Sequence, residues 1–232
     1  MIFSTAQIFP AAVAYYYVEF SLVKVFSYCL LITFLCGFLL YTISPRKKED
    51  LRTKDGFIIT VLFWMVLAIF GSFPFYFSSE INISYIDSLF ESISGITTTG
   101  ATVITGLDEL PRSLLFYRQL LQWLGGMGII VLAVAVLPLL GIGGMQLYKA
   151  ETPGPLKDTK LTPRITETAK ALWYVYLTMT VCCAMAYKWF GMSTYDAICH
   201  SFSTISIGGF STHDESFSFF SQPAIRWTAV IF

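Results

Sequence analysis

Charged side chains are scarce in this sequence. Asp, Glu, Lys and Arg make up 13% of the 232 residues, whereas hydrophobic residues make up 55%. A soluble domain carries about 25% charged residues, roughly twice that share. The apolar residues recur in several blocks, and one bilayer crossing needs roughly 20 mostly apolar residues. The composition therefore argues against a soluble domain and predicts a protein with several transmembrane helices.

Paired cysteines, blocks of like charge and hydrolase motifs are also missing. No CxxC pair occurs, so the five cysteines indicate small buried thiols rather than disulfides or metal ligands. No run of like charges suggests nucleic-acid binding. The first apolar run lacks a basic flank, which favours a membrane helix over a cleaved signal peptide. The absence of a GxSxG motif argues against an intramembrane serine hydrolase.

The apolar blocks predict an order of elements. Long blocks are expected to cross the membrane, whereas two blocks of about a dozen residues are too short to cross and are expected to be re-entrant. A last helix begins at Pro223. The predicted spans are 1–17 (a short one), 22–43, 57–77, 114–140 and 169–190, and the re-entrant segments are 85–96 and 195–205. Glycines at 125, 126 and 128 are expected to let another backbone approach the fourth span closely.

Basic residues set the expected orientation. The linkers 44–56 and 149–170 hold ten Lys and Arg residues, against five elsewhere, so these linkers are predicted to be cytoplasmic. Both re-entrant segments then enter from the outside. The outer side also carries nine acidic residues, which either concentrate cations or are ordinary solvated loop charges. The outer charges are Lys24, Arg112, Arg118, Lys188 and Arg226, with Glu19, Glu80, Asp87, Glu91, Asp108, Glu109, Asp196, Asp214 and Glu215.

An internal repeat is the most informative feature. Residues 85–102 align without a gap with residues 194–211, at a constant shift of 109. Each copy lies between two long apolar blocks, so both copies have the same orientation in the membrane. This predicts two helix–short helix–loop–helix units, at 57–140 and 165–232, after two extra helices at 1–43, with linkers at 44–56 and 141–164. The matching pairs include Asp87 and Asp196, Ser92 and Ser201, Ser94 and Ser203, Ile96 and Ile205, and Gly100 and Gly209.

Each copy has the parts of a cation filter. Asp87 and Asp196 are predicted to cap the short helices, whose C-terminal ends would bring negative dipole toward the membrane centre. The glycines that follow permit backbone shapes in which successive carbonyls face one side and replace the water shell of a cation. Two ordinary extracellular loops rich in small residues are the simpler alternative. The expected potassium-binding carbonyls belong to Thr98, Thr99, Gly100, Ala101, Ile207, Gly208, Gly209 and Phe210.

Two acidic pairs follow the two loops. Asp108 and Glu109 correspond to Asp214 and Glu215 at a shift of 106, so the pairs are expected to occupy similar places around an outer mouth. Of the two histidines, His200 is expected to pack or hydrogen-bond against the loop, because no further metal ligands accompany it. His213 is expected to be a solvated mouth residue.

Four stretches resemble one known family. They are SGITTTGAT (94–102), FSTISIGGFST (202–212), the RTKDGFIITVLFW run before the first and the QWLGGMGIIVLAVAVLP run after it. The chain resembles the Trk/Ktr/HKT superfamily, and within it the TrkH-type potassium uptake subunits of bacteria. The resemblance implies an all-α polytopic protein with four pore-loop repeats around one pore, preceded by two extra helices. This sequence supplies the extra helices and two of the repeats and stops within a helix, so about half of the pore is expected.

The resemblance also implies function and partners. It implies potassium uptake, by symport, across the bacterial cytoplasmic (inner) membrane, with no enzymatic activity. It further implies a homodimer in the lipid bilayer and a cytosolic nucleotide-binding regulatory subunit of the RCK type. Two alternatives stay open: a polytopic membrane enzyme, and a secondary carrier with broken helices, whose repeats are often inverted. The equivalence of the two copies favours a filter, because an active site needs different residues in different roles.

Overall fold

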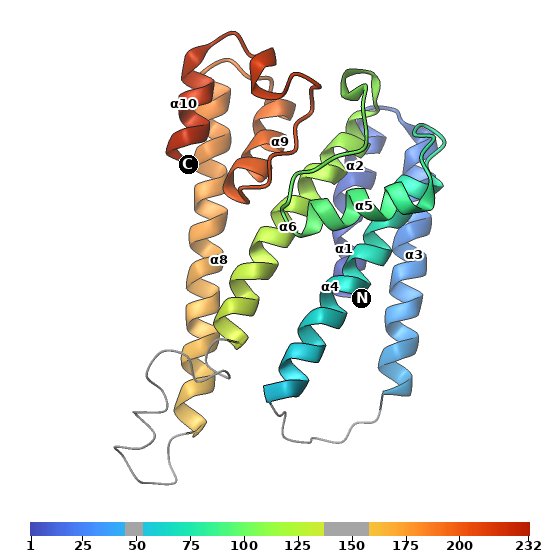
Figure 1. Cartoon of the computed structure of the whole chain (residues 1–232), viewed down its shortest axis with the longest axis vertical. Coiled ribbons are helices and arrows are strands. Elements are labelled where there is room, and N and C mark those ends of the chain that lie inside the picture. Colours follow the sequence, from blue (N-terminus) through green and yellow to red (C-terminus); the bar gives the residue numbers. More distant parts are fainter. Residues whose placement is uncertain (45–52, 137–157) are drawn as a thin grey trace.

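The computed structural model describes residues 1–44, 53–136 and 158–232 (Figure 1). These residues form α-helices and two short 3-10 helices, with no strand among them, which confirms the all-α prediction. The α-helices are α1 (Ile2–Ala6), α2 (Ile8–Tyr16), α3 (Phe20–Ile43), α4 (Thr53–Phe77), α5 (Tyr85–Ile96), α6 (Arg112–Val136), α8 (Asp158–Trp189), α9 (Thr194–Ile205) and α10 (Pro223–Ile231); the 3-10 helices are η1 (Leu107–Glu109) and η2 (Ser216–Phe219).

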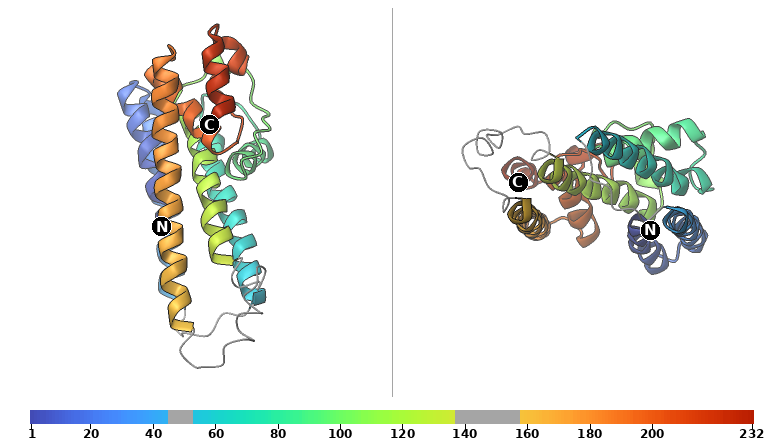
Figure 2. Two further views of the ribbon diagram at one scale, coloured as in Figure 1. Left: turned by 90° about the vertical axis from the view of Figure 1, so that its left-hand side faces the viewer. Right: turned by 90° about the horizontal axis from the view of Figure 1, so that it is seen from below.

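The long helices have the dimensions of membrane spans. By length and hydropathy, α3, the Thr60–Phe77 part of α4 and the Glu167–Trp189 part of α8 can each cross a bilayer. Helix α6 has 25 residues, as α4 has, which corresponds to a length of about 37 Å. Large apolar side chains are exposed along α3, α4 and α8, as expected for surfaces that face lipid or further protein. Figure 2 shows α4, α6 and α8 running along the long axis of the molecule.

The first predicted span is broken in the structure. Helix α1 ends at Ala6 and α2 begins at Ile8, with Gln7 between them. Both helices pack against α3, and α2 also packs against α6. The prediction of one continuous short helix over residues 1–17 was therefore wrong in detail, although the segment does lie beside the second span as an extra helical element.

The predicted linkers lie partly outside the described residues. Residues 45–52 and 137–157 are not described, and they include most of the expected linker 44–56 and much of 141–164. The described flanks are helical: α4 already begins at Thr53 and α8 at Asp158. Both helices thus start several residues before the apolar blocks do, because a helix can continue beyond the bilayer where its side chains are polar.

Two apolar clusters hold the described helices together. The first joins α1–α6 and is centred on buried side chains such as Phe26, Phe75, Tyr117 and Leu121. The second joins α8, α9 and α10 around Tyr187 and Met192. Helix α6 packs against α5, α8 and α9, so it lies between the two short helices and links the two clusters.

Candidate functional site

The two short helices begin in the same way. Ser84 Oγ accepts a hydrogen bond from the Asp87 backbone N–H (3.1 Å), and the Asp87 carboxylate accepts one from the Ser84 N–H (3.3 Å). In α9, Ser193 Oγ accepts from the Asp196 N–H (3.0 Å) and donates to the Asp196 carboxylate (2.6 Å). The N-caps are therefore the serines. The prediction that Asp87 and Asp196 are the caps was wrong by three residues, because each Asp occupies the third helical position, from which it supports the serine cap.

The loops after α5 and α9 share one backbone conformation. We call residues 97–102 the first glycine loop and residues 206–211 the second. Backbone φ is positive at Thr98 (56°) and Gly100 (76°), and again at the equivalent Ile207 (56°) and Gly209 (88°). The Thr99 N–H bonds to the Ser94 carbonyl at 2.9 Å, and the equivalent Gly208 N–H bonds to the Ser203 carbonyl at 2.9 Å. The repeat found in the sequence is thus also a repeat of backbone geometry.

Positive φ at Thr98 and Ile207 is unusual. Both side chains are β-branched, and such residues rarely adopt this conformation unless the surrounding structure imposes it. The residue between each pair, Thr99 or Gly208, has negative φ, so the sign alternates along each loop. An alternating backbone turns successive carbonyls toward one side rather than to opposite sides, which is the geometry a row of cation ligands requires.

The two glycine loops lie against each other. A Cβ atom added to Gly100 would lie 1.9 Å from the Gly208 carbonyl oxygen and 3.5 Å from the Gly209 Cα. Only a glycine at position 100 permits this approach. At Gly209 an added Cβ would have no neighbour within 4 Å in the described part of the chain. Gly100 of the first loop therefore packs against the second loop, whereas the space beside Gly209 of the second loop is unfilled by the described residues.

The C-terminal ends of both short helices pack against adjacent glycines of α6. A Cβ on Gly125 would lie 1.9 Å from the carbonyl oxygen of Ile96, the last residue of α5. A Cβ on Gly126 would lie 3.0 Å from Cβ of Ser206, which follows α9. The sequence-based expectation of close backbone contact is confirmed at Gly125 and Gly126, so one helix positions both loops. At Gly128 the expectation was wrong, because the nearest neighbour there is the Trp64 ring at 3.5 Å.

A buried ion pair lies behind the first loop. Arg118 Nε donates to Glu91 Oε1 at 2.7 Å, and both side chains are fully buried. Arg118 Nη2 donates to Thr102 Oγ1 at 2.9 Å, and Thr102 Oγ1 in turn contacts both Glu91 oxygens at 3.0 Å. The sequence assigned Glu91 and Arg118 to the outer side and left open whether acids such as Glu91 are solvated loop charges. Both side chains are buried, and they link α5, α6 and the end of the first glycine loop.

Two further side chains, His200 and Gln122, hold the second loop. His200 Nε2 lies 3.0 Å from Ser211 Oγ, and its Nδ1 lies 2.9 Å from the Asp196 carbonyl oxygen. Gln122 of α6 accepts a hydrogen bond from the Phe210 N–H at 3.2 Å, and its side chain fills the space that a Cβ at Gly208 would need. The expectation that His200 bonds against the loop agrees with this geometry. In the described residues no group of three or more His, Cys, Asp or Glu side chains could hold a metal ion.

Two of the predicted mouth acids connect the units. Asp108 lies 2.5 Å from His213 Nδ1 and accepts from the Asp214 N–H at 3.3 Å, while Asp214 accepts from the Gly106 N–H at 3.0 Å. The hydrogen bond with His213 lowers the pKa of the Asp108 carboxyl. Asp108 and Asp214 therefore meet at one junction rather than at separate places on a rim. His213 is not a freely solvated residue, because its ring stacks on Phe219 at 3.6 Å.

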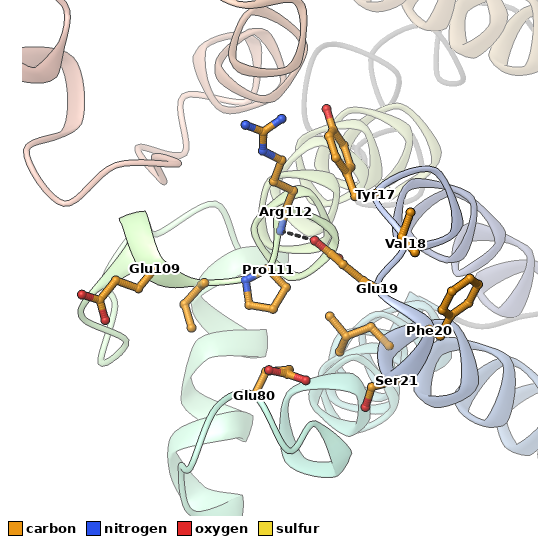
Figure 3. Close-up of a pocket in the computed structure, with 11 residues that line it drawn as sticks. Tyr17, Val18, Glu19, Phe20, Ser21, Glu80, Glu109, Pro111 and Arg112 are labelled. Carbon is orange, nitrogen blue, oxygen red and sulfur yellow. Dashed lines mark hydrogen bonds between the residues drawn. The ribbon is translucent and has the colours of Figure 1, made fainter.

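A pocket lies between the α2–α3 turn and the start of α6 (Figure 3). Glu19 points across it and accepts hydrogen bonds from the backbone N–H groups of Arg112 (2.8 Å) and Ser113 (3.1 Å). The carboxylate thus satisfies two of the free donors at the N-terminus of α6. Glu80 and Glu109 also line the pocket. We interpret it as a capping site for a helix rather than as part of an ion path.

The fold and these loops define a polytopic helical membrane protein built from repeated units, each with a short helix and a glycine loop. A family model described as "TrkH: Cation transport protein" matches residues 21–232. The chain belongs to the TrkH family. The resemblance seen in the sequence is thereby confirmed.

Several curated relatives carry names of the same system. The chain is 57% identical over 231 residues to the Trk system potassium uptake protein TrkH of Vibrio parahaemolyticus, covering 100% of this chain and 47% of that protein. It is 52% identical over 232 residues to TrkH of Escherichia coli K12, covering 100% of this chain and 48% of that protein. The crystal structure of the potassium transporter TrkH from Vibrio parahaemolyticus superposes with a TM-score of 0.87 at 51% identity, covering 99% of this chain and 46% of that one. The chain thus spans about half the length of these relatives.

Proposed function

We propose that this chain forms about half of a potassium uptake pore in the bacterial cytoplasmic (inner) membrane. The observation that carries the proposal is the contact between the two glycine loops, which repeat the same unusual backbone at an interval of 109 residues. The names of the relatives, which are Trk system potassium uptake proteins, support potassium as the transported ion. In this proposal potassium is the substrate, and the protein is a transporter rather than an enzyme.

The proposed ligands are backbone carbonyl oxygens. Each glycine loop would contribute a row of carbonyls that replaces the hydration shell of potassium, and the negative ends of α5 and α9 would favour a cation nearby. The two units proposed at 57–140 and 165–232 would supply two sides of the pore, and the remaining sides would come from further repeats in the full-length protein. The proposed ligands are the carbonyls of Thr98, Thr99, Gly100, Ala101, Ile207, Gly208, Gly209 and Phe210.

The experiment that tests this function uses the full-length protein. Cells that lack their own potassium uptake systems would be supplied with it and grown at limiting external potassium. We expect growth to be restored and rubidium uptake to be competed by potassium far better than by sodium. Growth that stays dependent on high potassium, with the protein present and folded in the membrane, would contradict the proposal. Uptake measured with and without a proton or sodium gradient would test symport.

The assembly is part of the same proposal. The family resemblance supports a homodimer and a cytosolic RCK-type subunit that binds nucleotides. Purification of the full-length protein from mild detergent, followed by mass measurement and by co-purification with that subunit, would test both. Failure to bind the subunit would remove the partner and leave the pore in place.

Neither alternative function is favoured by a specific feature. A membrane enzyme would need different side chains in different roles, whereas the two loops match in backbone shape, in their hydrogen bonds and in their glycines. A carrier with inverted repeats would place its two copies in opposite orientations. The two copies here follow one another after an even number of crossings, which keeps their orientation the same.

A further inference from the structure

The guanidinium group of Arg118 contacts both glycine loops. Besides Glu91 and Thr102, its Nη1 donates to the backbone carbonyl of Ser211 at 3.3 Å, and its Cζ lies 4.3 Å from the centre of the Phe210 ring. The side chain is fully buried. One residue of α6 thus reaches α5, the end of the first loop and the end of the second loop.

The two loop contacts are at equivalent positions. Thr102 is the second residue after Gly100, and Ser211 is the second residue after Gly209. Arg118 donates to the side chain of the first and to the carbonyl of the second. Because the bridged positions are related by the repeat shift of 109, the contacts fix how far apart the two glycines lie and at what relative depth.

The presence of a buried ion pair behind the loops calls for a functional explanation. Removing two charges from water is costly, and a well-packed apolar pair of similar size often gives equal or greater stability. Charged groups inside a membrane protein therefore usually serve its function. In the described part of the chain, Glu91 and Arg118 form the one ion pair whose two side chains are both fully buried.

We propose that Arg118, oriented by Glu91, is a positioning residue for ion selectivity, which sets the spacing of the two glycine loops. The inference rests on the proposed potassium uptake function. Neither side chain is itself an ion ligand in this proposal. Glu91 orients the guanidinium and balances its charge, and the planar fork of the guanidinium supplies the directed donors that reach both loops. Lysine, as a compact charge on a flexible stem, cannot reproduce these directions.

The test compares two variants of the full-length protein, one that keeps the buried charges and one that removes them. Arg118→Lys keeps the buried charge beside Glu91 and loses the fork. The double variant Glu91→Leu with Arg118→Met removes both charges, so that no buried charge is left unpaired. Lys188→Gln is the matched control, because it removes a positive charge from an exposed side chain in the last turn of α8, outside both loops. Each variant would be assayed for folded yield by size-exclusion chromatography and for the ratio of potassium to sodium uptake.

We expect both variants to fold and to retain uptake, with the potassium-to-sodium ratio lowered roughly tenfold or more, the scale on which loss of a charged hydrogen bond acts. The Lys188→Gln control should keep the wild-type ratio. A wild-type ratio in folded Arg118→Lys and in the folded double variant would overturn the proposal. If neither variant folds, the pair is a structural element and the proposal is equally overturned. If the full-length protein without substitutions showed no potassium uptake, the proposed function itself would be refuted.

Discussion

Glu91 and His200 occupy the same position in the two short helices, 109 residues apart, and each contacts the hydroxyl group eleven residues further along the chain. The partner of Glu91 is Thr102, and the partner of His200 is Ser211. The link from helix to loop is thus repeated, but with a carboxylate in one unit and an imidazole in the other. The carboxylate is balanced by Arg118, whereas the imidazole lies against the rings of Phe217 and Phe220 at 5.3 Å each.

The first prediction follows from this difference. His200→Glu places a carboxylate where the described structure offers no arginine, and an unbalanced buried charge costs about 3–5 kcal/mol. His200→Gln keeps a neutral side chain that can bond to Ser211. We expect His200→Glu to lower the thermal unfolding temperature of the full-length protein strongly and His200→Gln to lower it little. Equal melting temperatures for the two variants would show that position 200 is not buried as described.

The second prediction concerns the loop glycines. Gly100→Ser and Gly209→Ser each put a side chain where φ is positive, which costs about 1–3 kcal/mol, and at position 100 the new Cβ also meets the Gly208 carbonyl. We expect the ratio of potassium to sodium uptake in the full-length protein to fall roughly tenfold. Gly106→Ser is the control, because Gly106 also has positive φ (73°) but lies outside the loops, with open space around it. A fall of the same size in the control would assign the effect to general strain.

The third prediction concerns the paired glycines of α6. Gly125→Ala would drive a methyl group into the Ile96 carbonyl, and Gly126→Ala would drive one against Ser206. The Ile96 backbone cannot give way as a flexible side chain can. At Gly126 the nearest atom is the Tyr176 hydroxyl oxygen, at 2.7 Å, which is held by its hydrogen bond to the Trp123 carbonyl. We therefore expect a low yield of folded protein for both. Gly128→Ala should be tolerated, because its nearest neighbour is the Trp64 ring at 3.5 Å. The yield of monodisperse protein after detergent extraction measures this. Normal yields for all three alanines would contradict the packing of α6 against the short helices.

The fourth prediction distinguishes two roles among the four acidic residues that follow the glycine loops. Glu109 and Glu215 are exposed, and their carboxylates have no hydrogen-bond partner within the described ranges, so they can act through space over a Debye length of about 8–10 Å. Asp108 and Asp214 join the units through hydrogen bonds. We expect Glu109→Gln with Glu215→Gln to weaken uptake at low external potassium, and added salt to abolish the difference. Asp108→Asn with Asp214→Asn should give a deficit that salt does not remove. Uptake rates across a salt series would reveal either pattern.

The fifth prediction concerns the pocket in Figure 3. Glu19→Gln weakens the cap on the first two N–H groups of α6 and removes a negative charge from its positive end. We expect a loss of about 0.5–2 kcal/mol in stability, visible as a lower melting temperature with unchanged selectivity. Glu80→Gln is the control, since Glu80 lines the same pocket without capping a helix in the described structure. Equal losses in both variants would point to the charge of the pocket rather than to the cap.

Much of the fold could be predicted because its signals are local. The apolar blocks gave the long helices, and the two re-entrant segments were predicted within one residue of α5 and α9. The break at Gln7 was missed, although Pro10 marks it. Proline has no N–H to bond the carbonyl four residues back, which belongs to Ala6 at the end of α1, and its ring crowds that carbonyl. The early starts of α4 and α8 were also missed, because hydropathy detects where a helix enters the bilayer and not where it begins.

The site was predicted only as far as the repeat extends. Gly100, Gly209 and their neighbours follow from aligning two segments of one chain, whereas the bond of His200 to its loop was expected because no further metal ligands accompany it. The link between Glu91 and Arg118 joins residues 27 positions apart on different helices, and charge counting assigned both to the outer side without pairing them. One signal could have found them: each is a charged residue inside an apolar segment, which in a membrane protein points to a buried partner.

The adjacent glycines of α6 contact two short helices that are synthesised at different times. Helices α5 and α6 leave the ribosome before α9 does, so the end of α5 can dock at Gly125 while Gly126 is still vacant. When α9 follows, its own end meets a surface that the first unit has already shaped. The groups that join the two loops all come from residues 85–212: Gly100 with Gly208, Arg118 with Ser211 and Gln122 with Phe210. The first unit is thus synthesised before the second, and its loop is available for the second loop to pack against.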